Sequence, residues 1–217
     1  MKKYRIVEQS EVNQDVLAKI MKAIAMVHHY PVPDFLLHKR SVHEPLTVEQ
    51  ITDCVDGWLS VLREHEGHFD EKPLEKIAEK INSIIQWHNA GETNLIHGDF
   101  HLNNLLFDNE GEIVICDWQS VAVGHSSNDL GFFLSRFNAD GARISEKEVI
   151  DLYSKAVYEL YGKTVDGESI HRHLAASTLI TSFLFWHHFL HGVPKEKVEQ
   201  VYCEMVGIIS SYMFPII

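Results

Sequence analysis

The sequence predicts an α+β fold that is mostly helical and carries one small β-hairpin near its middle. Apolar residues recur at helical spacing before residue 93 and again after residue 128. Between these positions, short apolar runs are separated by turn residues, which is typical of short strands. No repeat and no linker divides the chain, so we expect residues 1–217 to form a single domain.

Three helices are predicted in the N-terminal part. The first ends near His29, just before two prolines. The second begins at Thr47 and Gln50, which have the spacing of a capping box, and is closed by Gly67. Pro73 then begins the third helix. The inward-facing residues are Val16, Leu17, Ile20, Met21 and Ile24 in the first helix, Ile51, Val55, Trp58, Leu59 and Leu62 in the second, and Leu74, Ile77, Ile81, Ile84 and Ile85 in the third.

The middle of the chain is predicted to form short strands. Apolar runs lie at residues 95–96, 105–107 and 113–116. The sequence Asp-Asn-Glu-Gly at residues 108–111 joins the last two runs and is typical of a hairpin turn. From there to about residue 128 the pattern is aperiodic, and we expect irregular structure.

Helices are predicted again in the C-terminal part. Helices resume after about residue 128, and Ser145 and Glu148 have capping-box spacing and begin one of them. A long apolar helix is predicted over about residues 170–191, and Pro194 begins the last helix. The sequence therefore places its one non-helical region inside a helical body.

The composition excludes several functional classes. Apolar residues make up 45% and charged residues 23% of the 217 residues, as in ordinary globular proteins. The net charge of −12 argues against binding to nucleic acid or to an anionic membrane, because both need a basic surface. The three cysteines match no metal-binding spacing and favour a reducing compartment. With neither a signal peptide nor a membrane-spanning stretch in its pattern, we expect a cytoplasmic protein.

The candidate chemical groups gather in the non-helical region. Asp99 and Asn104 lie in one predicted loop, and Asp117 follows the second strand of the hairpin. Because a hairpin folds back on itself, Asp117 is expected to lie close to Asn104. Carboxylate and amide oxygens are the ligands that Mg²⁺ prefers when nucleotide phosphates supply the rest. The sequence therefore predicts a magnesium and nucleotide site here.

Three motifs in this region resemble a known enzyme family. They are His-Gly-Asp-Phe-His-Leu-Asn-Asn-Leu-Leu-Phe at residues 97–107, Ile-Cys-Asp-Trp-Gln at residues 115–119 and Asn-Asp-Leu at residues 128–130. In order and spacing they resemble the catalytic loop, the metal-binding aspartate and a later aspartate of the aminoglycoside phosphotransferase and choline kinase-like superfamily. The similarity extends from about residue 16 to the C-terminus. It implies the large, C-terminal lobe of a protein kinase-like fold.

The resemblance implies a role for each matching residue. Asp99 would orient the hydroxyl of a small-molecule alcohol and accept its proton, and Asn104 and Asp117 would bind Mg²⁺ against the phosphates of ATP. His97 would brace the loop, and Asp129 would accept backbone N–H groups of the catalytic loop. The implied activity is ATP-dependent phosphoryl transfer to this alcohol, whose identity the motifs leave open.

Two alternatives use the same residues differently. His97, Asp99 and His101 at alternate positions resemble the ligands of a metal-dependent hydrolase. That hypothesis leaves Asn104 and Asp117 unexplained. In a purely structural interpretation, Asn104 is a turn former and Asp117 ends a strand.

The sequence departs from the family at its N-terminal end. The family's kinases have a small nucleotide-binding lobe before the catalytic lobe, with a glycine-rich loop and a phosphate-contacting lysine. Here about 95 residues precede His97, and their pattern predicts helices. The pattern thus predicts that this lobe is absent. A non-catalytic binding module or a gene fragment is a third hypothesis, and the exposed docking surface could promote self-association or receive a second chain that supplies the missing lobe.

Overall fold

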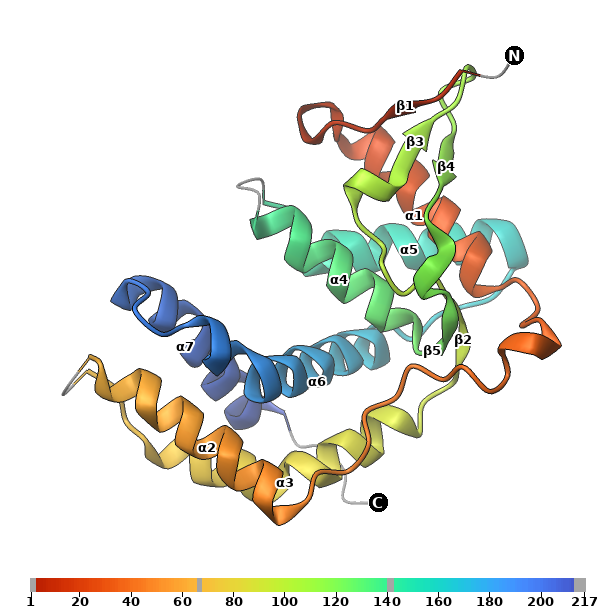
Figure 1. Cartoon of the computed structure of the whole chain (residues 1–217). Helices are drawn as coiled ribbons and strands as arrows, with labels where there is room; N and C mark the ends of the chain where they lie inside the picture. The colour runs from red at the N-terminus through yellow and green to blue at the C-terminus, as the bar shows by residue number, and fades with distance from the viewer. Residues whose placement is uncertain (1–2, 66–67, 140–142, 213–217) are drawn as a thin grey trace. The chain divides into compact units, whose positions relative to one another are not determined.

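The structure, a computed structural model, describes residues 3–65, 68–139 and 143–212. They form two compact units, each built from two separate stretches of chain (Figure 1). The first unit comprises Met1–Val42 and Glu92–Leu174, and the second comprises His43–Gly91 and Ala175–Ile217. The predicted fold class is confirmed, because helices dominate and the strands are few, short and antiparallel.

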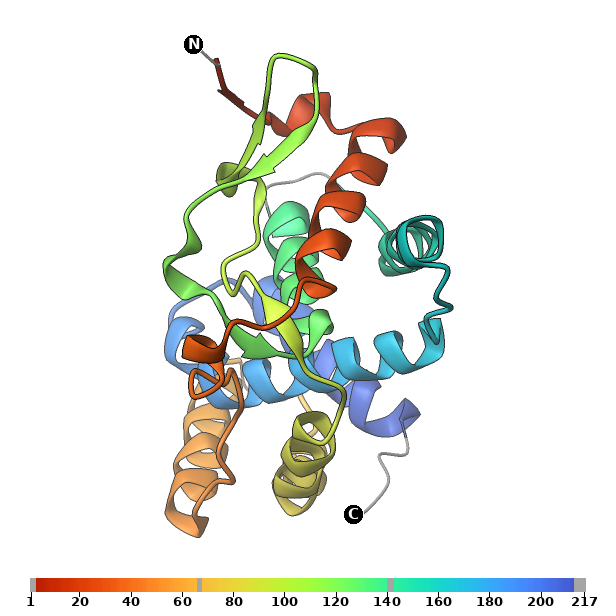
Figure 2. The ribbon, with the colours of Figure 1, turned by 90° about the vertical axis from the view of Figure 1, so that its right-hand side faces the viewer.

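The first unit packs helices against small sheets. Helix α1 lies beside the β3–β4 hairpin and also packs on α5, as both ribbon views show (Figure 2). The elements of this unit are β1 (Arg5–Ile6), η1 (Gln9–Glu11), α1 (Gln14–His28), η2 (Asp34–Leu36), β2 (Asn94–Ile96), η3 (Leu102–Asn104), β3 (Leu105–Phe107), β4 (Ile113–Ile115), η4 (Trp118–Ser120), β5 (Ala122–Gly124), α4 (Ser126–Ala139), α5 (Glu146–Tyr161) and the start of α6 (Gly167–Phe185).

Every element that the structure describes in the second unit is a helix. Its elements are α2 (Val48–Arg63), α3 (Lys72–Asn89), the rest of α6, η5 (Trp186–Phe189) and α7 (Lys195–Ser211). The predicted capping box of α2 is present, since Thr47 accepts from the Gln50 N–H and Gln50 accepts from the Thr47 N–H. Gly67, predicted to close this helix, lies outside the described residues.

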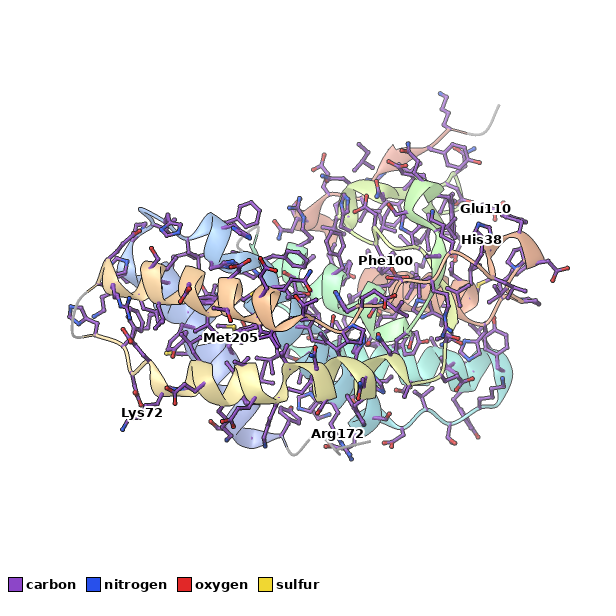
Figure 3. The ribbon with its side chains drawn as sticks, turned by 60° about the horizontal axis from the view of Figure 1, so that its bottom comes forward. His38, Lys72, Phe100, Glu110, Arg172 and Met205 are labelled. Atoms are coloured by element: carbon purple, nitrogen blue, oxygen red, sulfur yellow. The ribbon has the colours of Figure 1, made fainter. Side chains whose placement is uncertain are left out.

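Each unit has its own hydrophobic core. In the first unit Phe100 is fully buried, and in the second Met205 is (Figure 3). Every predicted inward-facing residue of α1 except Val16 is buried, and all five predicted for α3 are buried. In α2, Trp58 and Leu62 are buried, whereas Ile51, Val55 and Leu59 are partly buried against the same core. Helical periodicity therefore identified the buried faces of these three helices.

Two strands were not predicted. Strand β5 pairs antiparallel with β2, in the stretch expected to be irregular. Strand β1 pairs with β3, which makes a three-stranded sheet in the order β1-β3-β4. Each of these strands has at most three residues, too few for an alternating pattern to stand out.

The predicted long C-terminal helix is shorter than expected. Helix α6 ends at Phe185, and Trp186–Phe189 tightens into the 3-10 helix η5. This turn brings the His187 ring onto Gly57 of α2, where a Cβ atom on Gly57 would lie 2.5 Å from the ring. Apolar residues continue beyond Phe185, so the sequence alone does not mark where the α-helix ends. No described helix is both long enough and apolar enough to cross a membrane.

Candidate active site

The predicted catalytic loop, residues 97–104, lies between two strands of the first unit. It begins after β2 and ends where η3 leads into β3. Strands β3 and β4 pair with Leu105 opposite Ile115, and the Cys116 N–H donates to the Asn104 carbonyl at 2.9 Å. Asp117 is therefore the next residue after the one paired with Asn104, as the hairpin prediction required.

Asn104 and Asp99 are hydrogen-bonded to each other. The Asn104 side-chain amide nitrogen lies 2.9 Å from the Asp99 carbonyl oxygen and 3.1 Å from Asp99 Oδ2. Because this nitrogen donates to both atoms, the orientation of the amide is fixed and Asn104 Oδ1 remains as an acceptor. The Asp99 side chain is 36% exposed, and its other oxygen, Oδ1, lies 3.5 Å from His101 Nε2. One carboxylate is thus oriented and still reachable by a ligand.

Asp117 has a strained backbone. Its φ of 60° and ψ of 67° are left-handed, and among the described residues it alone combines a positive φ with a side chain. Such a conformation costs about 1–3 kcal/mol and persists where surrounding structure imposes it. Here the conformation turns the chain from β4 into η4 and leaves the Asp117 side chain exposed. A strained, exposed carboxylate beside the catalytic loop is typical of a functional position.

His97 connects the loop to the end of β4. Its Nδ1 lies 3.3 Å from the Asp99 backbone nitrogen, and its Nε2 lies 2.9 Å from the Cys116 carbonyl oxygen. Since the N–H donates to Nδ1 and the carbonyl can only accept, the ring proton resides on Nε2. The ring is fully buried and packs edge-on against Trp118 at 4.9 Å. Both nitrogens are therefore engaged with backbone groups.

The hydrogen bonds of His97 argue against the metal-hydrolase alternative. A metal ligand needs a free nitrogen lone pair, and His97 has none. Among the residues that the structure describes, no group of three or more His, Cys, Asp or Glu side chains is arranged to hold a metal ion. The arrangement does not favour a histidine-ligated metal centre at His97, Asp99 and His101.

Asp129 holds the start of the loop through two backbone hydrogen bonds. Its Oδ2 accepts from the His97 N–H at 2.7 Å, and its Oδ1 accepts from the Gly98 N–H at 2.8 Å. The carboxylate is 1% exposed, at the first turn of α4. It therefore holds two successive backbone donors of the catalytic loop in place.

Sequence reasoning missed two residues behind Asp129. His28 Nε2 lies 3.1 Å from Asp129 Oδ2, and His28 Nδ1 lies 2.9 Å from the Tyr153 hydroxyl. Burial raises the pKa of Tyr153, so its phenol stays protonated and can donate. Neither residue belongs to a motif: His28 lies at the end of a predicted helix, and Tyr153 follows the predicted capping box of another. Only their long-range contacts reveal the network.

Removing the Tyr153 hydroxyl is expected to destabilise the first unit. Tyr153→Phe keeps the ring but leaves the buried His28 Nδ1 without its partner, which costs about 1–3 kcal/mol. Urea unfolding measures the difference. Tyr158→Phe on the same helix is the matched control, because Tyr158 is 61% exposed, and its stability should be unchanged. Equal stabilities of the two variants would contradict the role of the network.

Gly98 is required by the shape of the loop. Its φ is +79°, and a Cβ atom added there would lie 2.3 Å from the Ser120 carbonyl oxygen. We expect Gly98→Ala to lower the free energy of unfolding by more than about 1 kcal/mol, because both the backbone conformation and the contact are unfavourable. Gly192→Ala is the control, since Gly192 has a positive φ but open space around it. An equal loss in both variants would show that the Ser120 contact adds nothing.

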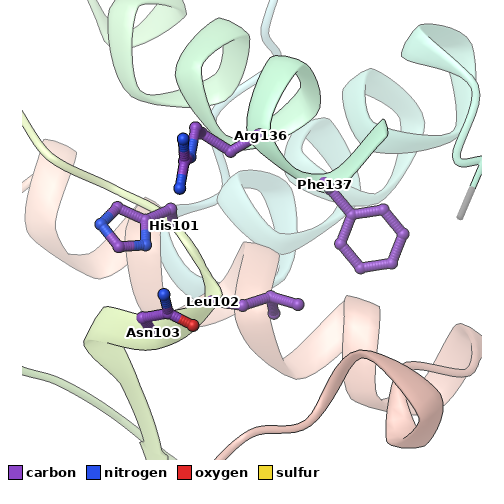
Figure 4. A pocket seen from close by; sticks show the side chains of 5 residues that line it. All are labelled: His101, Leu102, Asn103, Arg136 and Phe137. Carbon is purple, nitrogen blue, oxygen red and sulfur yellow. The ribbon is translucent and has the colours of Figure 1, made fainter. Parts of the chain in front are cut away.

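A small pocket lies next to the catalytic loop. Figure 4 shows His101, Leu102 and Asn103 of the loop on one side and Arg136 and Phe137 of α4 on the other. The Arg136 guanidinium is turned toward His101. Since His101 also contacts Asp99, the pocket adjoins the reachable carboxylate.

The described residues have a kinase-like phosphotransferase fold. The sequence model of the phosphotransferase enzyme family (APH) matches residues 4–160. The chain belongs to this family, which confirms the resemblance seen in the sequence.

Two curated proteins match parts of this chain. Acyl-CoA dehydrogenase family member 11 of Pongo abelii is 34% identical over 116 residues, which is 52% of this chain but 14% of that protein. The human protein of the same name is 34% identical over 69 residues, 31% of this chain and 9% of that protein. The chain therefore spans a small part of the curated relatives that it matches.

Solved structures of kinases share the fold. Choline kinase LicA from Streptococcus pneumoniae superposes with a TM-score of 0.55 at 14% identity, covering 96% of this chain and 68% of that one. Plasmodium vivax ethanolamine kinase gives 0.55 at 12% identity, covering 95% and 62%. An AMP-bound spectinomycin phosphotransferase gives 0.50 at 15%, covering 93% and 67%. At these identities the likeness shows the fold alone.

Proposed function

We propose that this chain is the catalytic lobe of an ATP-dependent phosphotransferase that transfers a phosphoryl group to the hydroxyl of a small molecule. The observation that carries the proposal is the pair of Asp99 and Asn104, hydrogen-bonded at 3.1 Å, with Asp117 following the residue that pairs with Asn104. The names of similar structures support the reaction class, since they include a choline kinase, an ethanolamine kinase and a spectinomycin phosphotransferase bound to AMP.

Asp99 is proposed as the general base. Its partly exposed carboxylate accepts the hydrogen bond of an acceptor hydroxyl and takes the proton as the oxygen attacks the terminal phosphate. The Asn104 amide and His101 limit the rotation of this carboxylate. His97 and Asp129 act as positioning residues, because His97 Nδ1 accepts from the Asp99 N–H and Asp129 accepts from the His97 and Gly98 N–H groups.

The side-chain oxygens of Asn104 and Asp117 fit Mg²⁺ bound to nucleotide phosphates. Asn104 Oδ1 remains an acceptor, and Asp117 adds a carboxylate, so both ligands are oxygens. Two protein ligands are too few for a tight site, so we expect the metal to bind together with the nucleotide. When bound, Mg²⁺ supplies positive charge against the phosphates.

Acceptor-dependent ADP release tests the proposed function. The purified chain is incubated with ATP and Mg²⁺, with and without a panel of small alcohols, and ADP is measured. Release that depends on both an alcohol and Mg²⁺ supports the proposal. If the chain neither binds Mg²⁺ and ATP together nor releases ADP with any alcohol, it is a non-catalytic module.

A further inference from the structure

We propose that the pocket beside the catalytic loop binds an anionic group of the acceptor. The acceptor would then be a hydroxylated small molecule that also carries a carboxylate or a phosphate. That the anion belongs to the acceptor rests on the proposed function. Anion binding by the pocket does not, because it can be measured without any reaction.

The position of the pocket suits an acceptor. His101 forms part of its wall and lies 3.5 Å from Asp99 Oδ1, so the pocket is one side chain away from the proposed base. The His101 ring is also fixed on its other side by Phe132 of α4, at 6.0 Å between centroids. A molecule anchored in the pocket can therefore extend past His101 and present a hydroxyl to Asp99.

The charge of the wall favours an anion. Arg136 contributes a guanidinium, His101 a ring and Asn103 an amide, while none of the five lining residues has a carboxylate (Figure 4). Within residues 3–65, 68–139 and 143–212, no carboxylate lies within salt-bridge distance of Arg136, and Asp140 lies outside these residues. A planar guanidinium matches a carboxylate or phosphate with two parallel hydrogen bonds.

The same wall disfavours a cation. An ammonium group placed here would meet the positive charge of Arg136 and find no carboxylate among the lining residues. Choline and ethanolamine, which name two of the similar kinases, carry that charge. Leu102 and the buried Phe137 close the apolar side of the pocket. Repulsion of amines and attraction of anions together set the specificity.

Titration of the isotope-labelled full chain by NMR tests the site directly. The probes are inorganic phosphate, acetate and tetramethylammonium, and the signals followed are those of the Arg136 and His101 side chains. We expect phosphate and acetate to shift both signals to saturation and tetramethylammonium to leave them unchanged. Arg136→Gln should weaken anion binding by about tenfold or more, since a charge-assisted hydrogen-bond pair is lost.

Arg172→Gln is the matched control. Arg172 lies on α6 in the first unit, 3.5 Å from Glu168, and its loss should leave the anion affinity unchanged. The inference is overturned if the anions do not shift Arg136 and His101, if Arg136→Gln binds them as well as the original chain, or if tetramethylammonium binds instead.

Transfer assays then separate the two anion sources and the two proposals. With ATP and Mg²⁺, glycerate offers a hydroxyl with a carboxylate, glycerol 3-phosphate a hydroxyl with a phosphate, and choline a hydroxyl with a cation. Greater ADP release with either anionic alcohol than with choline supports the inference and identifies the group. Greater release with choline overturns it. Saturable anion binding without any transfer supports the pocket and counts against the proposed function alone.

Discussion

Replacing Asp99 by asparagine is expected to reduce phosphoryl transfer by at least about 10²–10⁴-fold, the usual contribution of a general base. Asparagine has the same shape and can still accept the hydrogen bond from Asn104, but its amide cannot take a proton from the acceptor. The fold should be unaffected, because the Asp99 side chain is 36% exposed. The measurement is ADP release with saturating ATP and acceptor, together with urea unfolding of both forms.

The control for this substitution removes a carboxylate elsewhere. Asp151→Asn on α5 loses an exposed contact with Lys147 and should keep both activity and stability. Near-original turnover of the Asp99 variant, in a preparation active before the change, would remove Asp99 from the mechanism. A loss of transfer that parallels a loss of stability would instead assign Asp99 a role in folding.

Asp117→Asn is expected to abolish the effect of Mg²⁺ on nucleotide binding. The carboxylate is one of two proposed protein ligands, and its neutral amide is a much weaker one. We expect the affinity for ATP in the presence of Mg²⁺ to fall at least about 10–100-fold, as for loss of a metal-site residue. Calorimetric titration of ATP with and without Mg²⁺ measures this. An unchanged dependence on Mg²⁺ would exclude Asp117 as a ligand.

A glycine at the same position separates function from stability. Asp117→Gly removes the same carboxylate but relieves the left-handed backbone conformation at φ 60°. We expect this variant to lose the Mg²⁺ effect while its free energy of unfolding stays equal or rises by up to about 1–2 kcal/mol. A marked loss of stability would show that the Asp117 side chain supports the turn.

Much of the fold could be predicted because its signals are local. Two such signals are the capping box of Thr47 and Gln50 and the hairpin between residues 105 and 115. Each involves residues close in sequence, and both are present. The end of α6 at Phe185 could not be predicted, because apolar residues continue beyond it and the contact of His187 with Gly57 joins residues far apart in sequence. The two compact units each combine separate stretches of chain, so no linker in the sequence marks the boundary.

The sequence by itself determined the family, the fold class and the group of Asp99, Asn104 and Asp117. These residues lie on one loop and one hairpin, whose turn brings them together within a short stretch of chain. Only the tertiary structure decided what surrounds them. His28 is hydrogen-bonded to Asp129, 101 positions away in sequence, and to Tyr153, 125 positions away. Arg136 faces the catalytic loop from α4. The packing of α1, α4 and α5 creates these contacts, and no periodicity or spacing encodes which polar residues on different helices will meet.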